Sequence, residues 1–73
     1  MTENQENNLS FIPQDEIAHV CRAMCKSGGG FVSRLGEALK HADPDNTRRI
    51  KEAFPEYWNA YKKEYEENPE LYP

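Results

Sequence analysis

The sequence predicts an all-α fold, a compact bundle of about four short helices. Apolar residues recur at spacings of three and four along most of the chain, which is the period of one face of an α-helix. No segment alternates apolar and polar residues with the period of two that is typical of strands. Breaks containing glycine or proline separate the periodic segments and leave linkers of two to four residues.

The first helix is expected to begin at Pro13 and to end at the glycines after Lys26. Proline suits the first helical position, and Asp15 and Glu16 suit the positive end of the helix dipole. The four-residue spacing of the two cysteines places both on one face, which favours packed thiols over a disulfide. The apolar stripe of this helix is Ile17, Val20, Cys21, Met24 and Cys25.

A second helix is expected over residues 30–42. Gly36 lies inside it and costs about 1 kcal/mol relative to alanine, so we expect it to mark a close contact with another helix. The predicted buried face consists of Phe31, Leu35, Ala38, Leu39 and Ala42.

The third helix is expected over residues 44–54, because Asp43 suits the N-cap and Pro44 the first helical position. Ile50, Ala53 and Phe54 would form its buried face.

Pro55 disfavours helical geometry at the preceding residue and so separates a fourth helix, expected over residues 56–67. Trp58, Tyr61 and Tyr65 would share one side of it, with Tyr57 beside them. The Asn68–Pro69 pair ends the helix.

These elements predict one domain: a disordered N-terminal arm over residues 1–12, a helical domain over 13–68 and a C-terminal tail over 69–73. A chain of 73 residues forms only a small core, so we expect homo-oligomerisation to supplement it. The N-terminus lacks the features of a signal peptide, and no apolar run approaches the roughly 20 residues that span a bilayer. A cytoplasmic protein without membrane contact is expected, in the host cell if the chain is phage-encoded.

The net charge of −4 is unevenly distributed. Residues 1–21 carry four acidic and no basic residues, residues 22–51 carry seven basic and three acidic, and residues 52–73 carry two lysines and six glutamates. The acidic ends would repel phosphate and argue against nucleic-acid binding. The basic middle leaves room for a small anionic ligand or for the acidic end of a neighbouring subunit.

The triple glycine at residues 28–30 is the candidate binding site. It runs into the second helix, whose first N–H groups and positive dipole end can bind a phosphate. The residue order is not that of a P-loop or of a dinucleotide-binding fingerprint. The alternative is a plain corner in which the glycines supply positive φ. The candidate ligand-binding residues are Arg22, Lys26, Ser27, Gly28, Gly29, Gly30, Phe31, Ser33, Arg34, Trp58 and Tyr61.

Other chemistry has little support in the sequence. His19, Cys21, Cys25 and His41 do not share a helix face in the way that a zinc site requires. No nucleophile–base pair or carboxylate pair stands out. We therefore expect no metal, no cofactor and no enzymatic activity. The aromatic residues of the C-terminal third are expected to form core or an interface, with stacking on a nucleobase as the alternative.

Over residues 28–61 the chain resembles short open reading frames of phages and mobile elements. The shared pieces are a Gly-Gly-Phe helix start (residues 29–31), Ala-Leu-x2-Ala-Asp (38–43), Asn-x2-Arg-Ile (46–50) and Ala-Phe-Pro-Glu-Tyr-Trp (53–58). The resemblance covers about half the chain and carries no functional residue over. It implies a phage-type context, in which small acidic oligomeric proteins act against host defences.

Two functions are therefore expected as alternatives. In the first, a non-enzymatic oligomer sequesters a small anionic, nucleotide-like ligand at the glycine-rich helix start. In the second, the chain is a protein–protein inhibitor or adaptor of a host protein, which it contacts through its acidic ends and its aromatic C-terminal helix.

Overall fold

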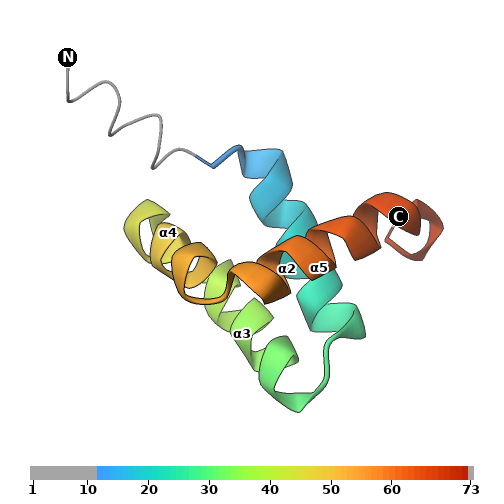
Figure 1. Cartoon of the computed structure of the whole chain (residues 1–73), viewed down its shortest axis with the longest axis horizontal. Helices are drawn as coiled ribbons and strands as arrows, with labels where there is room; N and C mark the ends of the chain where they lie inside the picture. The colour runs from blue at the N-terminus through green and yellow to red at the C-terminus, as the bar shows by residue number, and fades with distance from the viewer. Residues whose placement is uncertain (1–11, 73) are drawn as a thin grey trace.

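Helices make up most of the chain, and the predicted all-α class is confirmed. The computed structural model describes residues 12–72 (Figure 1). Its elements are α2 (Gln14–Ser27), α3 (Gly30–Lys40), α4 (Pro44–Ala53), α5 (Pro55–Glu67) and the short 3₁₀ helix η1 (Pro69–Leu71). Of the predicted N-terminal arm, residues 1–11 lie outside the described range. Ile12 belongs to the buried core instead.

Helix α2 is the central element, because it packs against both α3 and α5 (Figure 1). It begins one residue after the predicted start at Pro13, which takes the N-cap position. Its predicted apolar stripe is confirmed. Val20, Cys21 and Met24 are buried, and Ile17 and Cys25 pack half-buried against the same core.

Helix α3 packs on α2 along the line Val32, Gly36 and Leu39, all of them buried. The close contact expected at Gly36 is confirmed. A Cβ atom at this position would lie 2.9 Å from both the Cys25 Sγ and the Met24 Cβ. The absence of a side chain therefore lets the two helices approach along this line.

The predicted buried face of this helix was wrong at two of its five residues. Leu39 is buried, but Leu35 and Ala42 are only half-buried and Phe31 and Ala38 are exposed. The physical reason is the approach at Gly36, which turns the inner face toward residues three and four positions from it. Phe31 then falls outside the helix–helix contact.

Helix α4 begins as predicted, with the Asn46 N–H donating to Asp43 Oδ1 at 2.8 Å. Its burial differs from the prediction: Thr47 is buried, Ile50 and Phe54 are half-buried and Ala53 is exposed. Thr47 was missed because the sequence pattern counts only apolar side chains.

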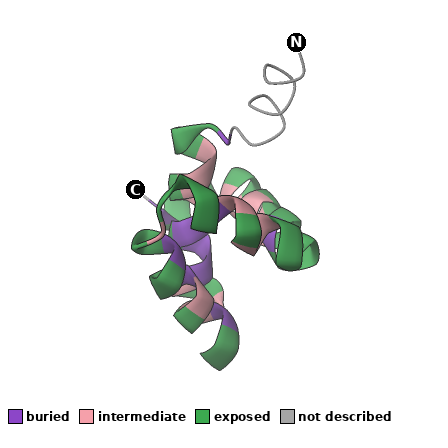
Figure 2. Ribbon diagram, turned by 90° about the vertical axis from the view of Figure 1, so that its left-hand side faces the viewer, coloured by how far each residue is buried: buried purple, intermediate pink, exposed green. Residues whose placement is uncertain are grey.

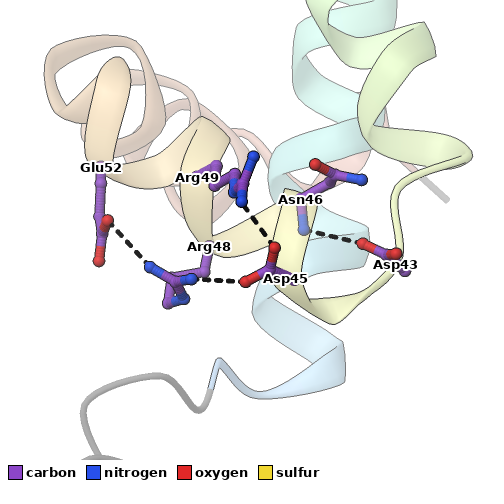
Figure 3. A network of polar contacts seen from close by, with 6 residues as sticks. All are labelled: Asp43, Asp45, Asn46, Arg48, Arg49 and Glu52. Atoms are coloured by element: carbon purple, nitrogen blue, oxygen red, sulfur yellow. Dashed lines mark hydrogen bonds and ion pairs between the residues drawn. The ribbon is translucent and has the colours of Figure 1, made fainter.

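The outer face of α4 carries a local network of ion pairs (Figure 3). Asp45 binds both Arg48 and Arg49, and Arg48 also contacts Glu52 at 3.2 Å. Exposed pairs of this kind contribute only about 0–1 kcal/mol each. They support the helix itself and join it to no other element.

Helix α5 starts at Pro55, one residue before the predicted start, and the expected break lies at Phe54, whose backbone leaves helical geometry with φ −130° and ψ 59°. Trp58 is fully buried, and Tyr61 and Tyr65 are half-buried on the same side. The prediction that these residues share one side of the helix is therefore confirmed, and this side faces the core.

The end of the described chain packs back on the helices instead of forming a free tail. Tyr72 is only 4% exposed and stacks on Tyr65, with 5.0 Å between the ring centroids. Its hydroxyl is hydrogen-bonded to the Ser27 hydroxyl at the end of α2. His19 also stacks on Tyr65, with 4.0 Å between the ring centroids.

Burial concentrates where α2, α3 and α5 face one another, and the outer helix faces are exposed (Figure 2). The largest fully buried side chains are Trp58, Met24 and Val20. Among the described helices, none is long and apolar enough to cross a membrane.

Substituting Gly36→Ala tests the α2–α3 contact. We expect the free energy of unfolding to fall by about 1–3 kcal/mol, because the added methyl group overlaps Met24 and Cys25. Gly30→Ala is the matched control, since a Cβ there meets nothing within 4 Å. Urea denaturation measures both. Equal stability of the two variants would contradict the close contact.

Candidate functional site

The glycine corner is an extended connection between α2 and α3. Gly28 and Gly29 have φ −77° and −76°, and no described glycine has positive φ, so positive φ at this corner was a wrong expectation. Gly28 is required by space, because its Cβ would lie 2.5 Å from the Met24 carbonyl oxygen and 2.7 Å from Val32 Cγ1. A Cβ at Gly29 or Gly30 would meet nothing within 4 Å.

The N-terminus of α3 has no side-chain cap and no acidic residue in its first turn. Its first N–H groups therefore keep their positive dipole end. The two serines expected to assist them have other partners. Ser33 Oγ donates to the Gly30 carbonyl at 3.2 Å, and the Ser27 hydroxyl is hydrogen-bonded to Tyr72.

The basic residues predicted to gather at this corner are divided between two places. Arg22 and Lys26 line a cavity of about 510 Å³ together with Lys40, and neither the glycines nor Arg34 belongs to its lining. Arg34 is exposed and forms no ion pair with any residue of the range 12–72.

Trp58, expected to stack on a ligand, is enclosed by the core and 0% exposed. Its indole Nε1 donates to Glu16 Oε2 at 2.8 Å. Lys51 Nζ donates to the same carboxylate oxygen at 3.2 Å and lies 5.5 Å from the indole centroid. This burial corrects the stacking role of Trp58. Tyr61 packs half-buried against the same core.

The Glu16 carboxylate joins α2 to α4 and α5. Partial burial raises the pKa of Glu16. The hydrogen bonds from Trp58 and Lys51 and the charges of Lys51 and Lys62 lower it by more than burial raises it, so the pKa lies below its ordinary value. A lowered pKa means that the ionised form stabilises the folded state. This stabilisation is complete above the ordinary glutamate pKa and is lost as the pH falls through the lowered value.

Substituting Glu16→Gln is expected to lower the free energy of unfolding by about 1.5–3 kcal/mol at neutral pH, the range for hydrogen bonds to a charged group. The difference between wild type and variant is expected to shrink on acidification from about pH 7 to about pH 3. Urea denaturation across this range measures it. Glu66→Gln, an exposed change on α5, is the control. A difference that is independent of pH would contradict the role of the charge.

Three aromatic rings form the most conspicuous exposed feature of the described chain. Phe31, Phe54 and Tyr57 contact one another with centroid separations of 5.7, 6.0 and 6.0 Å. Phe31 is 58% exposed and Tyr57 is 40% exposed. We call these three residues the aromatic cluster.

The positions of α3 and α5 explain why this cluster is exposed. The approach of α3 to α2 through Val32 leaves the preceding residue, Phe31, outside. The burial of Trp58 likewise turns the neighbouring Tyr57 outward on α5. The Phe54–Pro55 break between α4 and α5 brings the third ring to the same place.

A groove of about 380 Å³ between α3 and α4 continues from the aromatic cluster. Phe54 belongs to both features, so the two form one surface. The groove is lined by Ala38, His41, Ala42, Asn46, Arg49, Ile50, Ala53 and Phe54.

The cysteines are placed for packing. The Cys21 thiol donates to the Gly36 carbonyl at 3.4 Å, and burial together with the nearby Cys25 raises its pKa to about 11. A thiol with so high a pKa is a poor nucleophile at neutral pH. No group of three or more metal-ligating side chains occurs within residues 12–72.

Sequence reasoning placed Phe31 at the candidate site, Tyr57 among the aromatic residues of a core or an interface, and Phe54 on a buried face, but it did not bring the three together. A usable signal was present, because Gly36 marks the inner line of α3. Counting four positions back and three forward from it gives Val32 and Leu39, which leaves Phe31 off the buried face. The proximity of Phe31 to Phe54 is tertiary and has no local signal.

Comparison with protein-family models, with curated proteins and with solved structures gives no significant match for this chain.

The neighbours Phe31 and Val32 provide a direct test of the exposed cluster. Phe31→Ala is expected to change the free energy of unfolding by less than about 1 kcal/mol, because much of the ring is in solvent. Val32→Ala is expected to cost about 1–3 kcal/mol, although it removes a smaller side chain, because it is buried against α2. Thermal unfolding measures both. The reverse order would contradict the orientation of α3.

Proposed function

We propose that this chain is a non-enzymatic protein that acts by binding another protein, as an inhibitor or adaptor, through the aromatic cluster. The observation that carries the proposal is the mutual contact of Phe31, Phe54 and Tyr57 at the surface. Exposed aromatic side chains are enriched in protein interfaces, where they bury a large area with little loss of conformational freedom. Arg34, which forms no ion pair within residues 12–72, lies one turn from Phe31, and arginine is similarly favoured at interfaces.

The same geometry gives less support to a small nucleotide-like ligand. Four of the cavities within residues 12–72 are lined by residues other than Gly29, Gly30 and Arg34. Trp58 offers no free ring face. A small ligand requires a concave site that surrounds most of its surface, whereas a protein partner can cover a shallow cluster. A host protein is the partner that the resemblance to phage-type reading frames implies.

Site-specific photo-crosslinking tests this proposal. A photoreactive phenylalanine analogue is introduced at Phe31, at Tyr57 or, as a control, at Leu71, which is 42% exposed and lies away from the cluster. The variants are expressed in the cell that encodes the chain and irradiated, and the adducts are identified by mass spectrometry. We expect one shared protein adduct from positions 31 and 57 and none from 71.

Adducts from all three positions alike, or from none, would contradict the proposal. An adduct of the chain with itself would identify the cluster as a subunit contact and would support the expected homo-oligomer instead. Light scattering of the purified protein then measures the oligomeric state.

A further inference from the structure

We propose that the occupant of the groove between α3 and α4 is an amphipathic helix of a partner protein, with carboxylates beside its apolar residues. This inference rests on the proposed function, because it names the kind of segment that covers the aromatic cluster and the groove together.

The first step is the shape of the surface. Phe31, Arg34 and Ala38 are exposed at spacings of three and four, so they form one outer stripe of α3, which the exposed His41 continues at the C-cap. This stripe is about 15 Å long, or roughly three helical turns. The groove borders it through Ala38 and His41, and the aromatic cluster borders it through Phe31.

The second step is the conformation of the occupant. The described chain has no strand and therefore offers no sheet edge to an extended peptide. Two helices and the connection between them form the walls of the groove, and alanines at positions 38, 42 and 53 leave room there for larger side chains. Ile50 and Phe54 add apolar surface. A helix that presents apolar residues at i, i+3 or i+4, and i+7 fits such a surface.

The third step is the charge. Among residues 12–72, no carboxylate side chain lines the groove. Arg34 lacks an ion pair within residues 12–72. Arg49 lines the groove and contacts Asp45 at 3.1 Å, but both side chains are largely exposed, so this pair is weak and leaves guanidinium donors for a partner. Cations at the rim of an apolar surface select a partner with carboxylates.

The same charges disfavour a second copy of this surface as the occupant. A symmetric dimer brings each residue near its counterpart around a two-fold axis. The Arg34 and Arg49 side chains of the two copies would then lie on a shared interface without carboxylates in the groove to compensate them. Like charges facing each other oppose such pairing.

The test uses two synthetic helical peptides of about 14 residues, with leucines on one face and either glutamates or lysines at all flanking positions. Binding to the full chain labelled with ¹⁵N is measured by chemical-shift perturbation, which gives both the affinity and the location. We expect the glutamate peptide to bind at least about tenfold more tightly than the lysine peptide. Its perturbations should fall on the α3 stripe and the groove.

Charge variants of the chain test whether the peptide binds in the groove. Ala38→Glu places a carboxylate in the groove, and Arg34→Glu reverses the charge beside it. Each substitution is expected to lower the affinity for the glutamate peptide by roughly tenfold. Lys63→Glu is the matched charge reversal, because it is 73% exposed on α5 and does not line the groove. It is expected to leave binding nearly unchanged. Circular dichroism confirms that each variant is folded.

Equal affinity for the two peptides, perturbations outside the groove or an equal effect of Lys63→Glu would overturn this inference. So would the absence of binding by the glutamate peptide. These outcomes leave the proposed function standing if crosslinking at Phe31 and Tyr57 still captures a partner. If crosslinking captures no partner protein while the glutamate peptide binds the groove, the proposed function fails. The preference of the groove for an acidic amphipathic helix is then still supported.

Discussion

The contact between Gly36 and α2 is the constraint on which the rest of the structure depends. A bare Cα at this position lets α3 approach Met24 and Cys25, and the Cys21 thiol donates to the Gly36 carbonyl at the same point. The contact fixes the rotation of α3 about its own axis. Because of this rotation, Phe31 and Ala38 are exposed on the opposite side of the helix. The packing of Gly36 on α2 thus determines which residues of α3 are exposed at the candidate surface.

Helix α5 depends on a second anchor of a different chemical kind. Trp58 fills the core and uses its one polar atom to bind Glu16, so a buried ring and a charged hydrogen bond hold α5 on α2. Helix α4 has its own cap and ion pairs (Figure 3), and Lys51 and the half-buried Ile50 attach it to Glu16 and to the core. Its position beside α3 leaves the groove open. The close packing of α2 with α3 and α5 therefore occurs together with an uncovered groove between α3 and α4.

The sequence predicted the helices well because their signals are local. The Asp43 cap, the Pro55 break and the spacing of the α2 stripe each act within one turn, and the structure contains all three. The buried face of α3 could not be predicted by summing hydrophobicity, because a glycine with no side chain sets it. For Trp58, burial decides between the two expectations of core and ligand stacking in favour of the core, and its hydrogen bond to Glu16, 42 positions earlier, is a tertiary contact without a local signal.

The four glycines of this chain carry unequal evolutionary constraints. A side chain at Gly28 or Gly36 overlaps atoms of the core, whereas positions 29 and 30 have open space around them. Neutral drift would therefore replace the last two glycines of the triplet first. The two glycines most resistant to replacement would be Gly28 and Gly36, and the second of these lies alone within α3, outside any motif. Relatives of this chain are better recognised by a lone glycine four residues after a buried valine than by the triplet itself.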